Sequence, residues 1–335
     1  MEECISVFDM LKIGVGPSSS HTLGPWRAAE RFLSELQTEN LFDKITRVKV
    51  DLYGSLSLTG KGHATDLAIM LGLSGQDPEY IPVQDIDGII KKIENKNEIN
   101  LANNIVIPFY FLQDIVFNKN FLPFHANGLT FTAYLNDDTE YTSTFYSIGG
   151  GFVVKEERTN AKKKMEIKCA FPFSIQNADD LLRLTISQKK LISEIVYENE
   201  KSMRSEENIH HELMRIWQTM LECMYIGCHS EGILPGGLNV RRRAFDMHQG
   251  LIGLANYTTP QEWLESIRKT EVKFRQILKW VSCFALAVNE VNAALGRVVT
   301  APTNGSAGVI PAVLMYYMVI ENHDANFDED RKSVV

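Results

Sequence analysis

The sequence predicts an α+β fold, in which an N-terminal α/β part of the substrate-binding type precedes a partial all-helical part. Segments with helical and strand-like spacing of apolar residues alternate through the first half of the 335 residues. After residue 177 strand signals almost disappear and long helical runs begin. Between the two parts, residues 155–175 are rich in lysine and have the composition of a linker. We therefore expect two domains, residues 1–158 and 175–335.

Local patterns predict each element of the first part. Apolar spacing predicts helices, and period-two alternation predicts strands. The expected helices cover residues 3–12, 22–38 and 63–71. The stretch 74–104 that follows is polar, and its apolar pattern is interrupted. The expected strands cover residues 45–53, 129–135, 141–146 and 152–154, with an acidic hairpin turn at 136–140.

The second part is predicted to be helical throughout. Helices are expected over residues 177–203, 205–227, 240–254 and 260–295. Thr259 and Pro260 mark the start of the last of these as cap and first helical residue. Residues 309–320 are apolar on almost every side but much shorter than the ~20 residues needed to span a bilayer. They are expected to form a buried helix, and no membrane association is predicted.

Composition limits the possible partners. The formal net charge is −8, which makes a large basic surface for nucleic acid improbable and favours a small molecule or another protein chain. Five scattered cysteines indicate a reducing compartment rather than a disulfide framework. The acidic start is unlike a signal peptide, so we expect a cytoplasmic protein.

Residues 16–25, GPSSSHTLGP, place small hydroxyls ahead of a predicted helix. Free backbone N–H groups and the helix dipole at such a position favour an anion, for example the carboxylate of a small acid. The alternative is a capped turn, in which Ser20 or Thr22 only completes the start of the helix.

A second candidate is residues 60–66, GKGHATD, in a glycine-rich loop after a strand. A histidine at a helix start can stay neutral, which makes His63 a candidate general base. A structural histidine is the alternative reading. The segment lacks the glycine spacing and the Lys-Ser/Thr ending of a phosphate-binding loop.

Three further loops combine glycine with small polar or basic residues. Residues 147–151, SIGGG, end a strand where backbone N–H groups can approach a ligand, although they could equally form a bulge or sharp turn. The segment 232–243 contains three arginines that could clamp a carboxylate or face solvent. Residues 301–308 precede the apolar helix and again suit an anion. Each could also be a plain connection.

Taken together and in order, six motifs resemble those of the iron-sulfur L-serine dehydratases. They are residues 16–25 (GPSSSHTLGP), 60–66 (GKGHATD), 147–151 (SIGGG), 234–243 (LPGGLNVRRR), 289–293 (NEVNA) and 299–305 (VTAPTNG). The resemblance implies deamination of L-serine to pyruvate and ammonia by β-elimination at a [4Fe-4S] cluster. It makes His63 the catalytic base. The residues it places around the substrate are Ser18, Ser19, Ser20, His21, Ser147, Gly149, Gly150, Arg242, Asn304 and Gly305.

The sequence departs from the family pattern at the expected cluster. Many members carry a cluster cysteine two residues beyond the glycine of the last motif, where this chain has Ala307. No residue is therefore assigned as a metal ligand. The resemblance also implies a homodimer or a completing second chain, which would cover the apolar residues 309–320. The alternative function is a non-catalytic serine-binding or regulatory fragment without the cluster.

Overall fold

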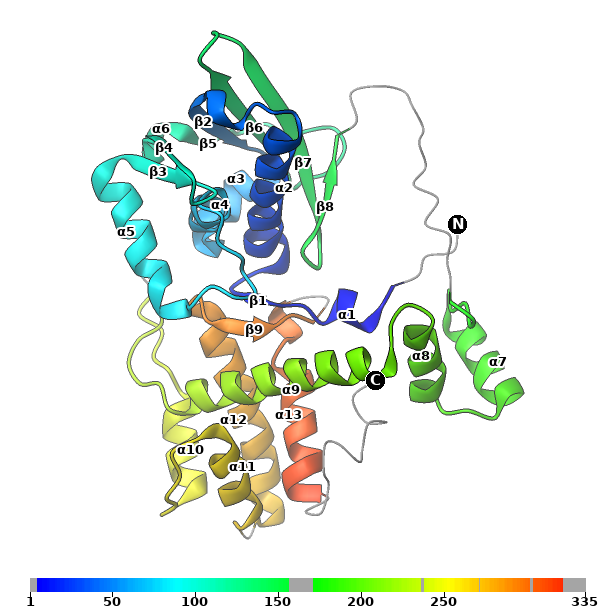
Figure 1. Ribbon diagram of the computed structural model, residues 1–335. Helices are drawn as coiled ribbons and strands as arrows, with labels where there is room; N and C mark the ends of the chain where they lie inside the picture. The colour runs from blue at the N-terminus through cyan, green and yellow to red at the C-terminus, as the bar shows by residue number, and fades with distance from the viewer. Residues whose placement is uncertain (1–4, 157–170, 236–237, 271, 302–303, 322–335) are drawn as a thin grey trace.

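The computed structural model describes residues 5–156, 171–235, 238–270, 272–301 and 304–321, and it has the predicted α+β fold. Figure 1 shows a sheet-containing N-terminal part above a helical C-terminal part. Each part has its own hydrophobic core. Phe32 and Phe131 lie in the first core, and Trp263, Trp280 and Phe284 lie in the second.

A five-stranded sheet forms the centre of the N-terminal part, in the order β5-β2-β6-β7-β8. Its strands are β2 (Ile45–Leu52), β5 (Ile115–Phe117), β6 (Gly128–Leu135), β7 (Glu140–Gly149) and β8 (Phe152–Lys155). β2 pairs with β5 in parallel, and the other neighbouring pairs are antiparallel. From Val48 to Leu52 every second residue of β2 is buried, as its period-two pattern predicts, and the register shifts before that between Ile45 and Arg47.

Helix α2 (Gly24–Thr38) covers one face of this sheet, where the ring of Phe32 stacks on Phe131 of β6 at a centroid distance of 5.0 Å. Helix α4 (Thr65–Leu73) packs beside α2. The remaining elements of this part are α1 (Val7–Met10), α3 (Gly54–Thr59), α5 (Ile86–Lys96), α6 (Phe111–Asp114) and the hairpin β3 (Glu98–Leu101) and β4 (Ile105–Pro108).

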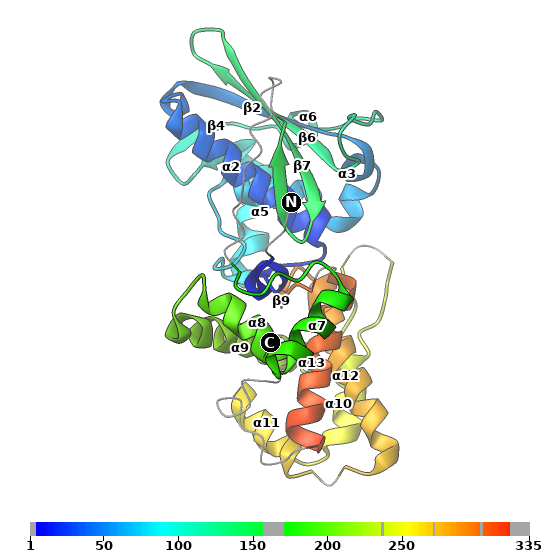
Figure 2. The same cartoon turned by 90° about the vertical axis from the view of Figure 1, so that its right-hand side faces the viewer.

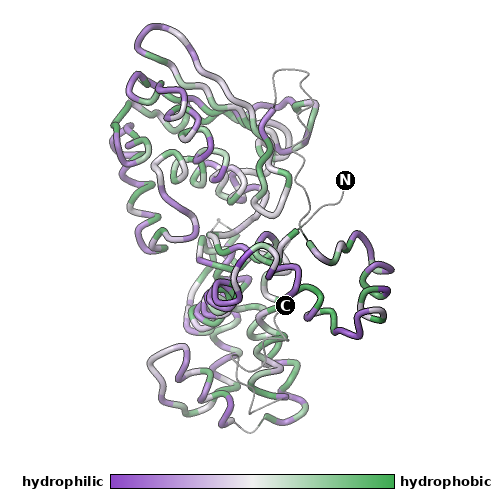
Figure 3. Tube along the Cα trace, turned by 45° about the vertical axis from the view of Figure 1, so that its right-hand side comes forward, coloured by the Kyte–Doolittle hydropathy of each residue, from purple (hydrophilic) through white to green (hydrophobic). Residues whose placement is uncertain are grey.

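The C-terminal part is built on the long helices α9 and α12, which pack against each other. Its helices are α7 (Ala178–Gln188), α8 (Ile192–Lys201), α9 (Glu206–Cys228), α10 (Ala244–Ile252), α11 (Pro260–Arg268), α12 (Phe274–Ala293) and α13 (Val309–Tyr316). Hydrophilic and hydrophobic residues are mixed along most of the helical part in Figure 3, as expected of helices with one buried face. Within the described residues, no helix has the length and apolarity required to cross a membrane.

A two-stranded sheet joins the two ends of the described chain. β1 (Ile13–Val15) pairs antiparallel with β9 (Arg297–Val299), and the backbone N–H of Gly16 donates to the Gly296 carbonyl at 3.1 Å. Both strands are only three residues long, and the sequence analysis predicted neither. This pairing places residues 16–25 next to the end of α12 and the loop before α13.

Several helices are shorter than predicted. The helix expected over 177–203 is two helices, because Lys189 takes a left-handed conformation with φ 52° and ends α7. The run 260–295 is also divided, into α11 and α12. Of the expected helix over 3–12, the described residues form only the single turn α1. The expected linker lies mostly within residues 157–170, outside the described residues.

The glycine-rich segment before His63 is helical, so its prediction as a loop is wrong. α3 begins at Gly54, whose φ of +54° suits glycine, and a 3-10 turn over Gly60–His63 continues it. Ala64, with φ 53°, separates this turn from α4, which begins at Thr65 rather than at His63. His63 therefore lies at the end of one helical turn and not in the first turn of α4. The polar stretch 74–104 likewise contains a full helix, α5, and strand β3.

Candidate functional site

Ser18, Ser19 and Ser20 lie in a tight turn between β1 and α2, residues 18–23 (the serine turn). Ser18 precedes a π-helical turn over Ser19–Leu23, and its Oγ accepts a hydrogen bond from the backbone N–H of His21 at 3.2 Å. The Oγ1 of Thr22 accepts from the Ser18 N–H at 3.1 Å and donates to the His63 carbonyl at 2.7 Å. The turn is thus capped by Ser18, and it is also tied to the segment that carries the candidate base.

His21 is held between two serine hydroxyls. Its Nδ1 lies 2.8 Å from Ser20 Oγ, and its Nε2 lies 2.9 Å from the Oγ of Ser55 on α3. Burial lowers the pKa of His21, and the neighbouring His63 lowers that pKa further. A neutral imidazole donates through one nitrogen and accepts through the other, so the hydroxyls of Ser20 and Ser55 take opposite roles toward it.

His63 lies against His21, with their ring centroids 5.0 Å apart. The Nδ1 of His63 is 3.0 Å from the backbone carbonyl oxygen of Thr59. Because a carbonyl can only accept, the neutral ring must carry its proton on Nδ1 and a lone pair on Nε2. A lone pair on the outer nitrogen is what a general base needs.

Ser147 of β7 contacts the serine turn from the sheet. Its hydroxyl donates to the backbone carbonyl of Ser20 at 2.7 Å. A Cβ on Gly24 would overlap the Ser147 hydroxyl, so the contact requires glycine at the start of α2. Gly149 and Gly150 follow with φ of +100° and +57° and turn the chain into β8. A Cβ on Gly149 would meet no atom within 4 Å, which leaves open space beside this backbone.

Two asparagines of the C-terminal part complete the site. The Nδ2 of Asn292, near the end of α12, donates to the Pro17 carbonyl at 3.0 Å. The Oδ1 of Asn292 accepts from the Nδ2 of Asn304 at 3.0 Å. Asn304 is only 5 % exposed, and its Oδ1 has no hydrogen-bond partner among the described residues. A buried acceptor without a partner marks a position where a ligand can donate a hydrogen bond.

The remaining predicted residues are less closely connected. Ser19 is in the turn but buried, and Gly305 is exposed with open space beside its Cα. Arg242 lies in the loop between α9 and α10, seen at the right of Figure 2. Its backbone N–H donates to the Gly232 carbonyl at 2.9 Å, and its Nη1 is buried with no partner among the residues that the structure describes. Within the described part of the chain, no hydrogen bond or ion pair joins Arg242 to the serine turn.

Sequence reasoning missed two residues of this arrangement. Ser55 lies in the glycine-flanked segment after β2, where hydroxyls were visible but unassigned. Asn292 lies in the NEVNA motif, which supported the resemblance but suggested no role for any of its residues. Ser55 could have been considered as a site residue because its segment is rich in hydroxyls. No local sequence signal connects Asn292 to Pro17.

The described cysteines do not fit an iron-sulfur cluster. Cys223, Cys228 and Cys283 are buried in the helical core, where the sulfur atoms of Cys228 and Cys283 lie 3.8 Å apart. Burial raises the pKa of Cys223 and Cys228, which keeps them as thiols, whereas cluster ligands are thiolates. In the part of the chain that the structure describes, no three Cys, His, Asp or Glu side chains form a metal-binding group. Cys4 and Cys169 lie outside that part.

Comparison with known proteins confirms the family resemblance. The family model described as serine dehydratase beta chain matches residues 6–158, and that described as serine dehydratase alpha chain matches residues 187–332. The L-serine dehydratase of Haemophilus influenzae is 43% identical over 93% of this chain and 66% of its own length. L-serine dehydratase 1 of Escherichia coli is 42% identical with the same two coverages.

The L-serine dehydratase of Streptomyces coelicolor is 43% identical, over 97% of this chain and 68% of its own length. The chain thus spans about two thirds of the length of the curated relatives it matches. The two family models follow each other in the order of the two parts of the fold and together cover most of the chain. The chain therefore belongs to the serine dehydratase family.

Proposed function

We propose that this chain binds L-serine between the serine turn and Asn304 and acts in its deamination to pyruvate and ammonia. The observation that carries the proposal is the position of His63. Its Nε2 lone pair is available, and its ring lies 5.0 Å from His21 within a site lined by hydroxyls. L-serine is proposed as the substrate because the relatives are named L-serine dehydratases.

The site offers complementary groups to both ends of an amino acid. The hydroxyls of Ser18 and Ser20, 3.5 Å apart, would donate hydrogen bonds to the substrate carboxylate. The free Oδ1 of Asn304 would accept a hydrogen bond from the substrate ammonium group. Arg242, with its buried Nη1, and Gly305 would belong to the same site once substrate is bound. Hydrogen bonds to charged groups contribute about 1.5–3 kcal/mol each.

His63 would remove the α-proton of bound L-serine and return a proton to the departing β-hydroxyl, so that water leaves and aminoacrylate forms. Aminoacrylate takes a proton at its β-carbon to give an imine, and hydrolysis of the imine yields pyruvate and ammonia. The water lost in the first stage is regained in the last, so the overall reaction is a deamination. The contact of Nδ1 with the Thr59 carbonyl would hold the imidazole in the orientation in which Nε2 accepts the proton.

Hydroxide is a poor leaving group, and the family resemblance implies a [4Fe-4S] cluster as the Lewis acid that assists its departure. Because the buried thiols do not fit that cluster, we assign it no ligand in this chain and derive no step from it. The same disagreement favours the second candidate function, a serine-binding protein without catalysis. Both functions require the site described above.

Two measurements on the 335-residue chain separate these functions. The first is binding of L-serine by calorimetry, which both functions predict. The second is pyruvate release from L-serine after anaerobic incubation with iron and sulfide. Pyruvate supports the dehydratase function, whereas binding without pyruvate supports the second candidate. Failure of L-serine to bind would contradict both.

The base assignment is tested in the same preparation. His63→Ala should lower kcat by about 10²-fold or more, because a positioned general base contributes that much. L-serine affinity should change little. His211, whose side chain is 72% exposed, provides a matched control, and His211→Ala should retain full turnover. Equal turnover of the two variants would exclude His63 as the base.

A further inference from the structure

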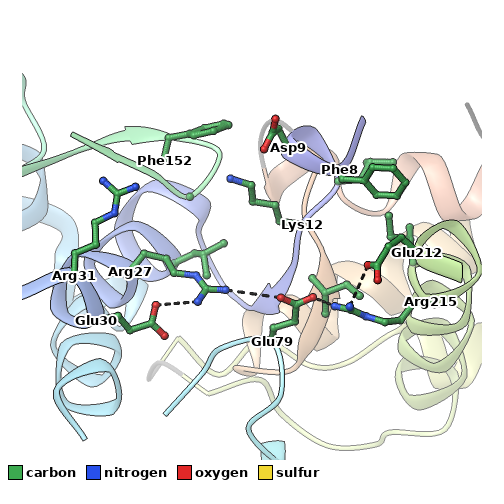
Figure 4. Close-up of a pocket in the computed structure, with 15 residues that line it drawn as sticks. Phe8, Asp9, Lys12, Arg27, Glu30, Arg31, Glu79, Phe152, Glu212 and Arg215 are labelled. Carbon is green, nitrogen blue, oxygen red and sulfur yellow. Dashed lines mark hydrogen bonds and ion pairs between the residues drawn. The ribbon is translucent and has the colours of Figure 1, made fainter. Parts of the chain in front are cut away.

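A separate cavity of about 510 Å³ lies between the two parts of the molecule. It is lined by residues of α1, β1, the first turns of α2, the β7–β8 turn and α9, together with Glu79 from the loop after α4 (Figure 4). Its volume is in the range of small-molecule sites. Leu23 and Gly151 line it, and Leu23 is also the last residue of the serine turn. A Cβ on Gly151 would lie 2.8 Å from the Leu23 side chain, so these two residues close that wall.

Two arginines of the cavity are neutralised by carboxylates. Arg27 lies 2.8 Å from Glu30 and 3.9 Å from Glu79. Arg215 of α9 forms ion pairs with Glu79 and, at 3.1 Å, with Glu212. Figure 4 shows these pairs along one side of the cavity. The charges of Arg27 and Arg215 are therefore largely neutralised by these carboxylates.

The other two cations have no such partner. Lys12 directs its Nζ to the ring of Phe152, 3.6 Å from the centroid, and Arg31 donates from Nη1 to the Val153 carbonyl at 2.5 Å. Among the described residues, no carboxylate oxygen lies within the 4.0 Å ion-pair distance of either side chain. Both side chains reach toward the space beneath Phe152 in Figure 4.

Lys12 and Arg31 are thus two cations of the cavity without an ion-pair partner within 4.0 Å among the described residues, and Asp9 also lines the cavity. Burial lowers the pKa of Lys12, Asp9 opposes this effect, and the positive charges of Arg27 and Arg31 lower the pKa further. A negative ligand beside Lys12 would relieve this repulsion. The guanidinium of Arg31 has N–H donors to spare, and the ammonium of Lys12 has three.

We propose that this cavity binds a small carboxylate anion between Lys12 and Arg31, at a site separate from the serine turn. The carbon body of the ligand would lie against Phe152 and the apolar residues Leu11 and Leu23. A carboxylate is favoured over phosphate because Phe152, Leu11 and Leu23 offer apolar surface beside the two cations, which a ligand with a carbon body can cover and phosphate cannot. The proposal does not depend on the dehydratase reaction.

The test is calorimetric titration of the 335-residue chain with succinate, and separately with inorganic phosphate, at constant ionic strength. Succinate should bind and raise the melting temperature. Lys12→Gln and Arg31→Gln should each weaken succinate binding about tenfold, from loss of a charged hydrogen bond. Lys12→Arg, which keeps the charge, should retain binding. Lys91→Gln is the matched control, because Lys91 is exposed and pairs with Asp87 on α5.

A variant of the proposed substrate site separates the two proposals. Asn304→Ala should weaken L-serine binding and leave succinate binding unchanged, since Asn304 does not line this cavity. If Asn304→Ala loses L-serine binding but still binds succinate, the two sites are separate and the anion-site proposal stands. The anion site is overturned if wild type does not bind succinate, if Lys12→Gln and Lys91→Gln bind it equally, or if phosphate binds as tightly as succinate.

Discussion

The side-chain amide of Asn304 donates to the side-chain oxygen of Asn292, and this contact decides which end of the Asn304 amide is free. Asn292 must itself present its oxygen, because its nitrogen donates to the Pro17 carbonyl. The two contacts form one directed chain, in which Asn304 donates to Asn292 and Asn292 donates to Pro17 beside the serine turn. They leave an acceptor, not a donor, unpartnered at Asn304.

We therefore expect Asn292 to act as a positioning residue for L-serine. Asn292→Ala removes the partner that orients Asn304, and L-serine affinity should fall about tenfold, which corresponds to ~1.4 kcal/mol. The free energy of unfolding should also fall by about 1–3 kcal/mol, because the Pro17 carbonyl and the Asn304 nitrogen lose their partners. Calorimetry and urea unfolding measure the two effects.

Asn289 on the same helix provides the control. Its side chain is exposed, so Asn289→Ala should change neither the affinity nor the stability. If both variants bound L-serine with wild-type affinity, the orienting role of Asn292 would be refuted.

Gly16 should not accept even one methyl group. A Cβ at this position would overlap the backbone and side-chain oxygens of Asn292, which cannot move without breaking the chain to Pro17. Gly16→Ala should lower the free energy of unfolding by about 1–3 kcal/mol and weaken L-serine binding. In contrast, Gly88→Ala on α5, where a Cβ meets nothing within 4 Å, should leave stability unchanged or raise it by up to ~1 kcal/mol. Equal unfolding midpoints for the two variants would contradict the steric argument.

His248 should make the helical part sensitive to mild acid. It is fully buried, its Nε2 accepts from the Trp263 indole N–H at 2.8 Å, and its Nδ1 has no partner within the described chain. Burial lowers its pKa to about 4, and the neighbouring His229 contributes in the same direction. The unfolded chain, with a histidine pKa near ~6.5, then binds the proton more readily than the folded chain. Stability should therefore be complete above about pH 6.5 and fall as the pH approaches 4.

Urea unfolding of wild type and His248→Gln from pH 7 to pH 4.5 checks this expectation. The variant should be less stable at neutral pH, because its fit to Trp263 is poorer, but its stability should depend less on pH. Parallel pH profiles for the two proteins would show that another group is responsible.

The sequence predicted β2, β6, β7 and β8 of the central sheet because their signal is local, and it missed the three-residue strand β5. In β2 every second residue from Val48 to Leu52 is buried, as its alternating sequence predicts, whereas β6 is buried along most of its length. β1 and β9 carry no such signal. Each has three residues, and each is a strand only because the other, at the opposite end of the chain, pairs with it.

The candidate site likewise contains residues that a local sequence signal identifies and residues that no local signal identifies. The hydroxyls of Ser18 and Ser20 and the imidazoles of His21 and His63 could be selected because reactive groups cluster in two short motifs. Asn292 could not, because its function depends on the close approach of Pro17 from another part of the fold. The glycines before His63 were misleading, since they indicate a loop by composition but occur in helical turns here.

Glu290, two residues before Asn292, should affect stability alone. It is 5 % exposed, and its carboxylate accepts from the backbone N–H of Arg243 at 2.7 Å and of Ala244 at 3.3 Å, at the start of α10. A carboxylate there satisfies helix N–H groups and interacts favourably with the helix dipole. Glu290→Ala leaves both N–H groups without a partner and should lower the free energy of unfolding by about 2–3 kcal/mol.

Glu290→Gln keeps an acceptor oxygen and loses only the charge, so its cost should be smaller, about 1 kcal/mol. Neither variant should change L-serine affinity at temperatures where the protein remains folded, because Glu290 contacts the start of α10 and not the serine turn. Urea unfolding and calorimetry on the same samples measure both quantities. A loss of L-serine affinity in Glu290→Ala as large as that in Asn292→Ala would mean that the end of α12 acts as one unit, and that the separate roles of its residues are wrong.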